Sequence, residues 1–244
     1  MHDATRAVPT LSTTLDVLLA LSKPTRWQTV MFDPLAYIHP ERLHLPAIFD
    51  SPAQRAAINR LLIARYRLDL PRLPQPLQSA RPRNETEELL LKHWLHLPQI
   101  VFLLGCQRLR LALARRGGLL RLPASARAFI TLPLLPPALQ GEPANESETG
   151  PSAGRARSAV APAPDHATLL RHGLRQLDLG LGGLPALLAQ RLPLLFAPEI
   201  DDAVPRNDAK AAAAPTTEDA CDPSHALTLR MAIQHVKRHP ISAE

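Results

Sequence analysis

The 244-residue chain contains only two cysteines, Cys106 and Cys221, too far apart in sequence to indicate a disulfide framework or a zinc cluster. Aromatic residues make up only 4% of the chain and β-branched residues are sparse, which disfavours a β-sheet protein. The longest uninterrupted apolar run, Ile100 to Leu104, is far shorter than the roughly 18 to 20 residues of a membrane span. We therefore expect a protein of a reducing compartment without a membrane-spanning helix.

A secretory signal is also missing from the start of the chain. The first residues, Met1-His2-Asp3, are polar, and the first leucine-rich stretch, Leu11 to Leu21, is interrupted by Asp16. These features predict a soluble, cytoplasmic protein.

Lysine is scarce, because only four of the 28 basic residues are lysine and the rest are arginine. Residues 1–140 carry 18 basic and 9 acidic side chains, whereas residues 141–244 carry 10 and 13, so the formal charge of +6 comes from the N-terminal part. A basic balance is typical of proteins that bind nucleic acids or anionic membranes. Together with the abundance of alanine, leucine and proline, the arginine excess also fits a GC-rich coding bias.

Proline is unusually frequent, with 26 residues, and leucine and alanine dominate the apolar composition. This composition favours short helices separated by prolines, so we expect an all-α fold: an irregular Pro-rich N-terminal segment packed on a bundle of short helices. Apolar periodicity and helix-start signals predict helices over residues 11–22, 51–68, 84–97, 98–116, from 165, from 185 and over 224–238. Three starts are well marked: Ser51 with Gln54 as a capping box, Asn84 with Glu87, and Asp165 as an N-cap.

Two stretches contain almost nothing to bury and predict disorder, and they divide the chain. The expected organisation is an N-terminal helical domain (1–140), a linker (141–165), a helical hairpin that packs on the N-terminal part (166–200), a second disordered stretch (201–223) and a C-terminal helix (224–244).

No residue pattern supports catalysis or a cofactor. His93 and His96 are three apart and His235 and His239 are four apart, but neither pair has a third ligand at a familiar metal-site spacing. Gly-x-Ser-x-Gly is absent, and the Gly-x-Gly-Gly string that begins at Gly180 follows a helical pattern rather than a strand. We therefore expect no catalytic site, no metal and no cofactor.

A cluster of arginines late in the third predicted helix and beyond it forms a possible basic interaction surface. Its members are Arg108, Arg110, Arg115, Arg116 and Arg121. The absence of interleaved aromatics and of a recognisable DNA-binding module favours a solvated or protein-facing surface over nucleic acid.

The most informative stretch runs from Met31 to Leu43, with the sequence Met-Phe-Asp-Pro-Leu-Ala-Tyr-Ile-His-Pro-Glu-Arg-Leu. It resembles the N-terminal signature of the SctK (YscK/PscK) family, the adaptors of the type III secretion sorting platform. The positions that carry the resemblance are Phe32, Asp33, Pro34, Tyr37, Ile38, His39, Pro40 and Leu43, and we expect all of them except Asp33 to be structural or partner-binding.

The resemblance implies a non-catalytic cytosolic adaptor at the inner-membrane secretion apparatus. Its implied partners are the cytoplasmic domain of the SctD-type ring protein and the SctQ-type pod protein, with no small-molecule substrate. Two alternatives stay open. A basic helical regulator or nucleic-acid-binding protein would use the basic half, and another cytosolic secretion component would be a stator-like protein or a chaperone.

Overall fold

The computed structural model describes residues 25–44, 51–70, 85–115, 117–135, 163–203 and 223–239. The helix predicted over 11–22 and most of the stretches 141–165 and 201–223 lie outside these residues. Within the described part, residues 163–165 lead into a helix and residues 201–203 belong to one, so each of these ends of the two stretches is ordered.

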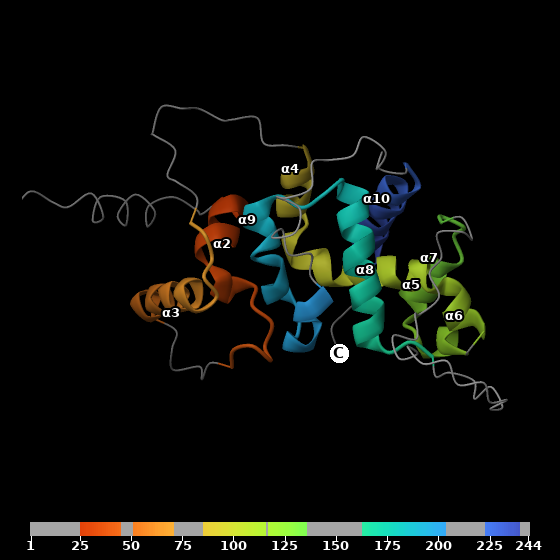
Figure 1. Cartoon of the computed structure of the whole chain (residues 1–244), viewed down its shortest axis with the longest axis horizontal. Helices are drawn as coiled ribbons and strands as arrows, with labels where there is room; N and C mark the ends of the chain where they lie inside the picture. The colour runs from red at the N-terminus through yellow and green to blue at the C-terminus, as the bar shows by residue number, and fades with distance from the viewer. Residues whose placement is uncertain are drawn as a thin grey trace, which may run out of the picture.

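The described residues form helices and contain no strand, which confirms the all-α prediction (Figure 1). In chain order the elements are α2 (Arg26–Phe32), η1 (Pro34–Ala36), α3 (Pro52–Arg65), α4 (Glu85–Lys92), η2 (Trp94–His96), α5 (Leu97–Arg108), α6 (Arg110–Arg115), η3 (Gly118–Arg121), α7 (Ala124–Ile130), α8 (His166–Leu181), α9 (Ala186–Ala189), η5 (Leu192–Leu195), η6 (Pro198–Ala203) and α10 (Pro223–Arg238).

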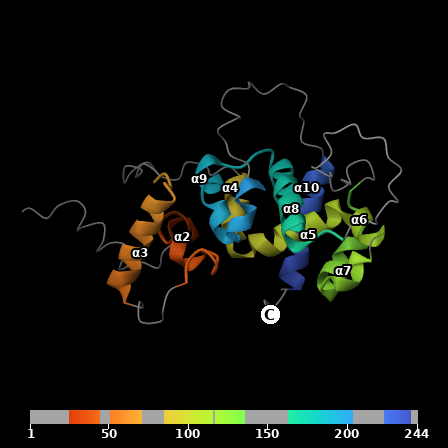
Figure 2. The ribbon, with the colours of Figure 1, turned by 60° about the horizontal axis from the view of Figure 1, so that its bottom comes forward.

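Helix α3 lies at one end of the molecule and helices α6 and α7 lie at the other, with α5, α8 and α10 between them (Figure 2). Only Asn59 and Leu62 of α3 are buried, and its main neighbour is η1. The helix therefore projects from the body of the protein.

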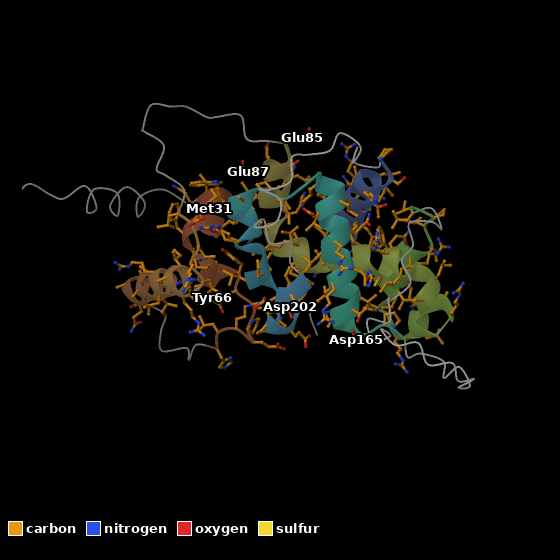
Figure 3. The ribbon with its side chains drawn as sticks, viewed as in Figure 1. Met31, Tyr66, Glu85, Glu87, Asp165 and Asp202 are labelled. Atoms are coloured by element: carbon orange, nitrogen blue, oxygen red, sulfur yellow. The ribbon has the colours of Figure 1, made fainter. Side chains whose placement is uncertain are left out.

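The capping signals that the sequence carries are confirmed. Ser51 and Gln54 form a reciprocal capping box at the start of α3, with Pro52 in its first turn. Asp165 caps α8 at its N-terminal end by accepting a hydrogen bond from the Thr168 amide at 2.8 Å (Figure 3). Glu85 and Glu87 lie in the first turn of α4, where the helix dipole favours negative charge.

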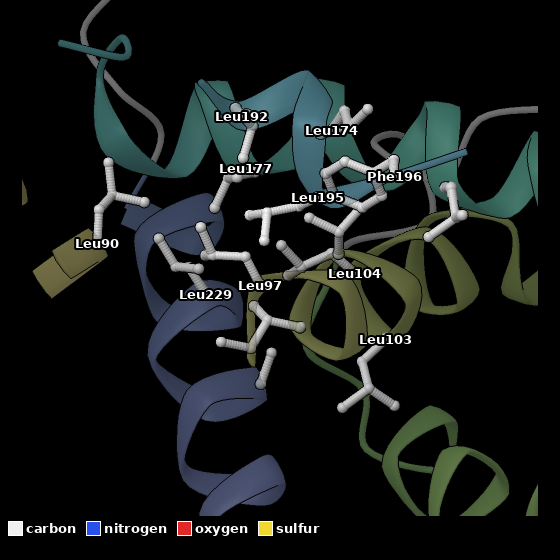
Figure 4. Packing of buried hydrophobic residues seen from close by; sticks show 14 of the residues in the cluster. Leu90, Leu97, Leu103, Leu104, Leu174, Leu177, Leu192, Leu195, Phe196 and Leu229 are labelled. Atoms are coloured by element: carbon white, nitrogen blue, oxygen red, sulfur yellow. The ribbon is translucent and has the colours of Figure 1, made fainter. Parts of the chain in front are cut away.

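The core forms where α5 packs across α8, and α10 closes it from a third side (Figure 4). Leu97, Leu104, Leu174, Leu177 and Leu229 meet there, and each is at most 2% exposed. Burial of leucine side chains on this scale is the main source of stability in a helical domain.

No single helix in the described ranges is long and apolar enough to cross a membrane. Helix α4 (Glu85–Lys92) and the following segment Trp94–Arg108 are together long and apolar enough, but they are bent by 68° where they meet, and much of their apolar surface is buried in the core.

Several predicted elements differ from the structure. The Pro-rich N-terminal segment was expected to be irregular, yet its described part begins with α2, because Thr25 and Gln28 form a capping box and the next proline, Pro34, comes only after the helix. The helix predicted over 98–116 is divided at Leu109, where the chain turns so that both Leu109 and Leu113 are buried. Local periodicity cannot show such a turn, since tertiary burial decides it.

Two further expectations are corrected in the C-terminal half. The helix predicted from Pro185 ends at Ala189, because Pro193 has no amide hydrogen and would clash with the preceding turn; a 3₁₀ helix, η5, follows. Leu227, Met231 and Val236 are the positions from which the sequence predicts an amphipathic C-terminal helix; Val236 is buried, but Leu227 and Met231 are 52% and 36% exposed. The apolar part of the buried face of α10 consists of Val236 together with Leu229, Ala232 and Ile233.

Candidate protein interface

Tyr37 anchors the Met31–Leu43 signature in the core. Its hydroxyl donates a hydrogen bond to the Val30 carbonyl oxygen at 2.8 Å, and its ring packs edge-on against Trp94 with centroids 5.6 Å apart. Burial of the ring raises the pKa of the Tyr37 phenol, and of the nearby charges Arg191 lowers it and Asp33 raises it. In the folded chain this tyrosine is an internal packing residue.

The other apolar signature positions flank this anchor. Pro34 is buried at the start of η1, and Phe32 packs edge-on against Trp27 with centroids 5.8 Å apart. Ile38 is partly buried against the core, Leu43 is half-buried and Pro40 is exposed. The signature thus combines buried anchors with a surface turn.

The second half of the signature is tied to a segment more than 150 residues further along the chain. The His39 amide donates a hydrogen bond to the Leu194 carbonyl oxygen at 2.7 Å. Arg42 donates to the Phe196 carbonyl oxygen at 2.6 Å and forms an ion pair with Asp201. Burial alone would lower the pKa of Arg42, but Asp201, helped by Tyr66, outweighs it and raises the pKa. Sequence reasoning passed over Arg42, because its partner is distant in sequence.

The first half of the signature holds α3. The Asn59 side chain on α3 donates to the Asp33 carboxylate at 2.7 Å and accepts from the Leu35 amide at 2.9 Å. Asn59 is only 9% exposed, so these hydrogen bonds are shielded from water. The signature therefore connects the core to the projecting helix α3, and we refer to it in this connecting role as the bracket.

Arg191 is a second linking residue that the sequence did not reveal. Its side chain is fully buried and donates to the Leu187 and Asp69 carbonyl oxygens at 2.9 and 2.8 Å, and to that of Met31 at 3.3 Å. Burial lowers the pKa of its guanidinium. The Arg191 side chain thus joins α9, the end of α2 and the chain just after α3. The sequence feature that could have indicated this role is a charged residue inside a leucine-rich segment.

A groove of about 770 Å³ opens beside the signature. It runs between the His39–Glu41 turn, the start of α5, the η3–α7 corner, the start of α8 and η6. Its apolar lining includes Phe102, Leu113, Leu169, Leu170, Leu195 and Phe196. Concave apolar surfaces of this size are common binding sites for ligands or partner segments.

Charged and titratable side chains line the groove as well. His39, Glu41, Arg121, Asp165, His166 and Glu199 contribute to its wall. The His166 ring lies 5.2 Å from the Phe102 ring, centroid to centroid. The hydrogen bond with Thr168 lowers the pKa of Asp165, which is therefore engaged as a helix cap. Both signs of charge around an apolar floor suit a protein segment better than a polyanion.

No group of three or more His, Cys, Asp or Glu side chains that could hold a metal ion occurs among the residues with described positions. The only thiol in that part of the chain is Cys106, which is fully buried, and burial raises its pKa to about 12. This thiol is thus protonated and inaccessible at neutral pH. Cys221 lies outside the described residues.

The arginines predicted as a basic surface occupy different environments. Arg108 is half-buried and donates to the Gln176 side chain at 3.2 Å, and burial lowers the pKa of its guanidinium. Arg110 is partly buried, Arg115 is exposed at the end of α6, and Arg121 reaches the groove. Arg116 lies outside the described residues. Of this set, the structure brings Arg121 to the same site as the signature residue His39.

Comparison with known proteins shows to which class of proteins the chain belongs. A family model described as "Bacterial type III secretion apparatus protein (OrgA_MxiK)" matches residues 27–238. These residues include the signature, the core helices and the groove, so the protein is a component of a type III secretion apparatus.

The chain belongs to the OrgA/MxiK family, which confirms its resemblance to the SctK adaptors. It is similar to the oxygen-regulated invasion protein OrgA of three Salmonella typhimurium strains, 14028s, SL1344 and LT2. In each comparison the identity is 36% over 218 residues, which is 89% of either chain. No solved structure matches the chain.

Proposed function

We propose that this protein is a non-catalytic cytosolic adaptor of the sorting platform, which links the cytoplasmic domain of the SctD-type ring protein to the SctQ-type pod protein. Membership of the OrgA/MxiK apparatus family across residues 27–238 is the observation that carries the proposal. The name of its relatives, oxygen-regulated invasion protein, places those proteins in bacterial invasion.

The shape of the described part of the chain supports an adaptor role. Long-range hydrogen bonds of Arg42 to Phe196 and Asp201, and of Arg191 to Met31 and Asp69, tie these described segments to one another and give them a stiff arrangement. The apolar groove beside the signature is a surface on which a partner segment can dock. A stiff body with a groove fits a connector that must hold two partners at a fixed separation.

The groove test uses the protein with the purified ring-protein cytoplasmic domain and pod protein of the same secretion system. We expect the three to co-elute as one complex in size-exclusion chromatography with light scattering. Arg121→Glu combined with Glu41→Lys inverts two exposed charges of the groove wall, and we expect about tenfold weaker binding of one partner.

Arg127→Glu is the matched control, because Arg127 is exposed on α7 but does not line the groove. Failure of the unmodified protein to bind both partners at the same time would refute the adaptor role. Equal binding by the groove variant and the control would instead move the docking surface elsewhere.

A further inference from the structure

Helix α3 presents an apolar stripe to solvent. Ala57, Leu61 and Ala64 recur at i, i+4 and i+7, all three are exposed, and Leu61 keeps 69% of its surface accessible. This spacing is the d, a, d pattern of a helix that packs along another helix. The opposite face of α3, with Asn59 and Leu62, is the one that meets the protein.

Arginines border the stripe on both sides. With Leu61 at an a position, Arg60 falls at g and Arg65 at e, the positions that flank the seam in a helix pair. Both side chains are exposed, and α3 contains no acidic residue between Pro52 and Arg65. A partner helix with glutamate or aspartate along its own edges would match this face.

The signature fixes the position of α3. Asn59 binds Asp33 and Leu35, while Tyr37, His39 and Arg42 bind the core. The bracket thus holds a helix that buries little of its own surface. A rigid mount for an exposed helix is expected when that helix has an external partner, since pre-organisation lowers the cost of binding.

We propose that the outer face of α3 is a docking surface for an acidic amphipathic helix of a protein partner, packed on Ala57, Leu61 and Ala64 and paired with Arg60 and Arg65. The inference rests on the adaptor function, to which it adds a second surface at the opposite side of the signature from the groove. A second copy of this chain is disfavoured, because two α3 faces would oppose arginine with arginine. A lipid surface is disfavoured, because Leu61 is the only large apolar side chain of the stripe.

The test measures binding of a synthetic peptide of three heptads with leucine at a and d and glutamate at e and g. The same peptide with lysine at e and g is its control. We expect the full-length protein to bind the glutamate peptide and not the lysine peptide, with affinity that falls as sodium chloride is raised.

Arg60→Glu combined with Arg65→Glu should weaken this binding at least about tenfold, because two attractions become repulsions. Leu61→Gln should weaken it as well. Arg230→Glu combined with Arg238→Glu reverses two exposed charges on α10 and should leave binding unchanged. Melting temperatures should match across the set, since all these side chains are exposed.

Equal affinity of the α3 and α10 variants for the glutamate peptide, or no binding by the unmodified protein, would overturn the proposal. Loss of binding to anionic vesicles in the α3 variant, without peptide binding, would replace it with a lipid surface, and loss of a dimer would replace it with self-association. If the ring and pod proteins fail to bind while the peptide results hold, the adaptor assignment fails and the docking surface stands.

Discussion

Gly105 on α5 and Gly173 on α8 mark the place where the two core helices touch backbone to backbone. A Cβ on Gly105 would lie 1.8 Å from the Leu169 carbonyl oxygen, and one on Gly173 would lie 1.9 Å from that of Val101. Both distances are far inside van der Waals contact. The absence of a side chain at these two positions therefore sets the separation of the helices.

We predict that Gly105→Ala and Gly173→Ala each destabilise the protein by about 2 kcal/mol or more, because the helices must move apart and the core loses contacts. Alanine has a better helix propensity than glycine by about 1 kcal/mol, so the steric cost of the added Cβ is larger than the net loss of stability by that amount. Chemical denaturation measures the difference. Gly180→Ala is the control on α8, since its Cβ would meet the nearest atom, the His225 carbonyl oxygen, at 3.1 Å; a loss as large as at Gly173 would contradict the argument.

Tyr37 can be dissected into its hydroxyl and its ring. Tyr37→Phe removes the hydrogen bond to the Val30 carbonyl oxygen and should cost about 1–2 kcal/mol, whereas Tyr37→Ala also empties the space beside Trp94 and should cost about 3–5 kcal/mol. Because the folded pKa is raised, the unfolded tyrosine ionises first, and stability should fall as the pH rises above about 10. Tyr37→Phe should lack this alkaline component in urea titrations at pH 8 and pH 10.5.

We predict that the free energy of unfolding falls in mild acid because of the buried side chain of His93. Its side chain is 6% exposed, and burial followed by the charges of Lys237, Lys92, His96 and Arg26 lowers its pKa to about 4. The unfolded histidine takes up a proton near pH 6.5 and the folded one does not. The stabilisation that neutral His93 gives the folded state is therefore fully present above that pH, and it is lost as the pH falls towards 4.

His93→Gln should therefore flatten the change in unfolding free energy between pH 7 and pH 4.5 by on the order of 2 kcal/mol. His96→Gln, at an exposed position one turn away, is the control. Identical pH dependence in the two variants would show that the buried imidazole is protonated without penalty.

Arg191→Met should destabilise the protein by about 3 kcal/mol, because three carbonyl oxygens on three segments lose their shared donor. Arg175→Met, at an exposed position of α8, should change stability by less than about 0.5 kcal/mol. Hydrogen exchange of the amides of α3 should also accelerate in the Arg191 variant, because the Asp69 anchor is released. Unchanged exchange there would show that the signature alone holds the helix.

Features governed by neighbours in sequence could be predicted. The capping box of Ser51 and Gln54 and the cap of Asp165 each join residues three positions apart, so the sequence contains the whole interaction. The all-α class followed in the same way from composition and proline content. The Met31–Leu43 signature stood out in the sequence through its resemblance to the SctK family, and the structure shows that several of its side chains are buried.

Features governed by distant segments could not be predicted. The division of the helix at Leu109, where both Leu109 and Leu113 are buried, depends on tertiary packing, and the rotation of α10 depends on the position of α8. The roles of Arg42 and Arg191 depend on carbonyl groups more than 100 residues away in sequence. The groove is likewise assembled from five separated segments, in which the sequence had indicated only the signature and Arg121 as interaction residues and Asp165 only as a helix cap.

The ties from His39 and Arg42 to residues 194–201 also order events during synthesis. The bracket under α3 cannot close until Asp201 has left the ribosome, because one of its two attachments is made by residues near that position. Until then α3 is part of a nascent chain without a fixed mount. The position of α3 on the body of the protein is thereby set only when the chain is nearly complete.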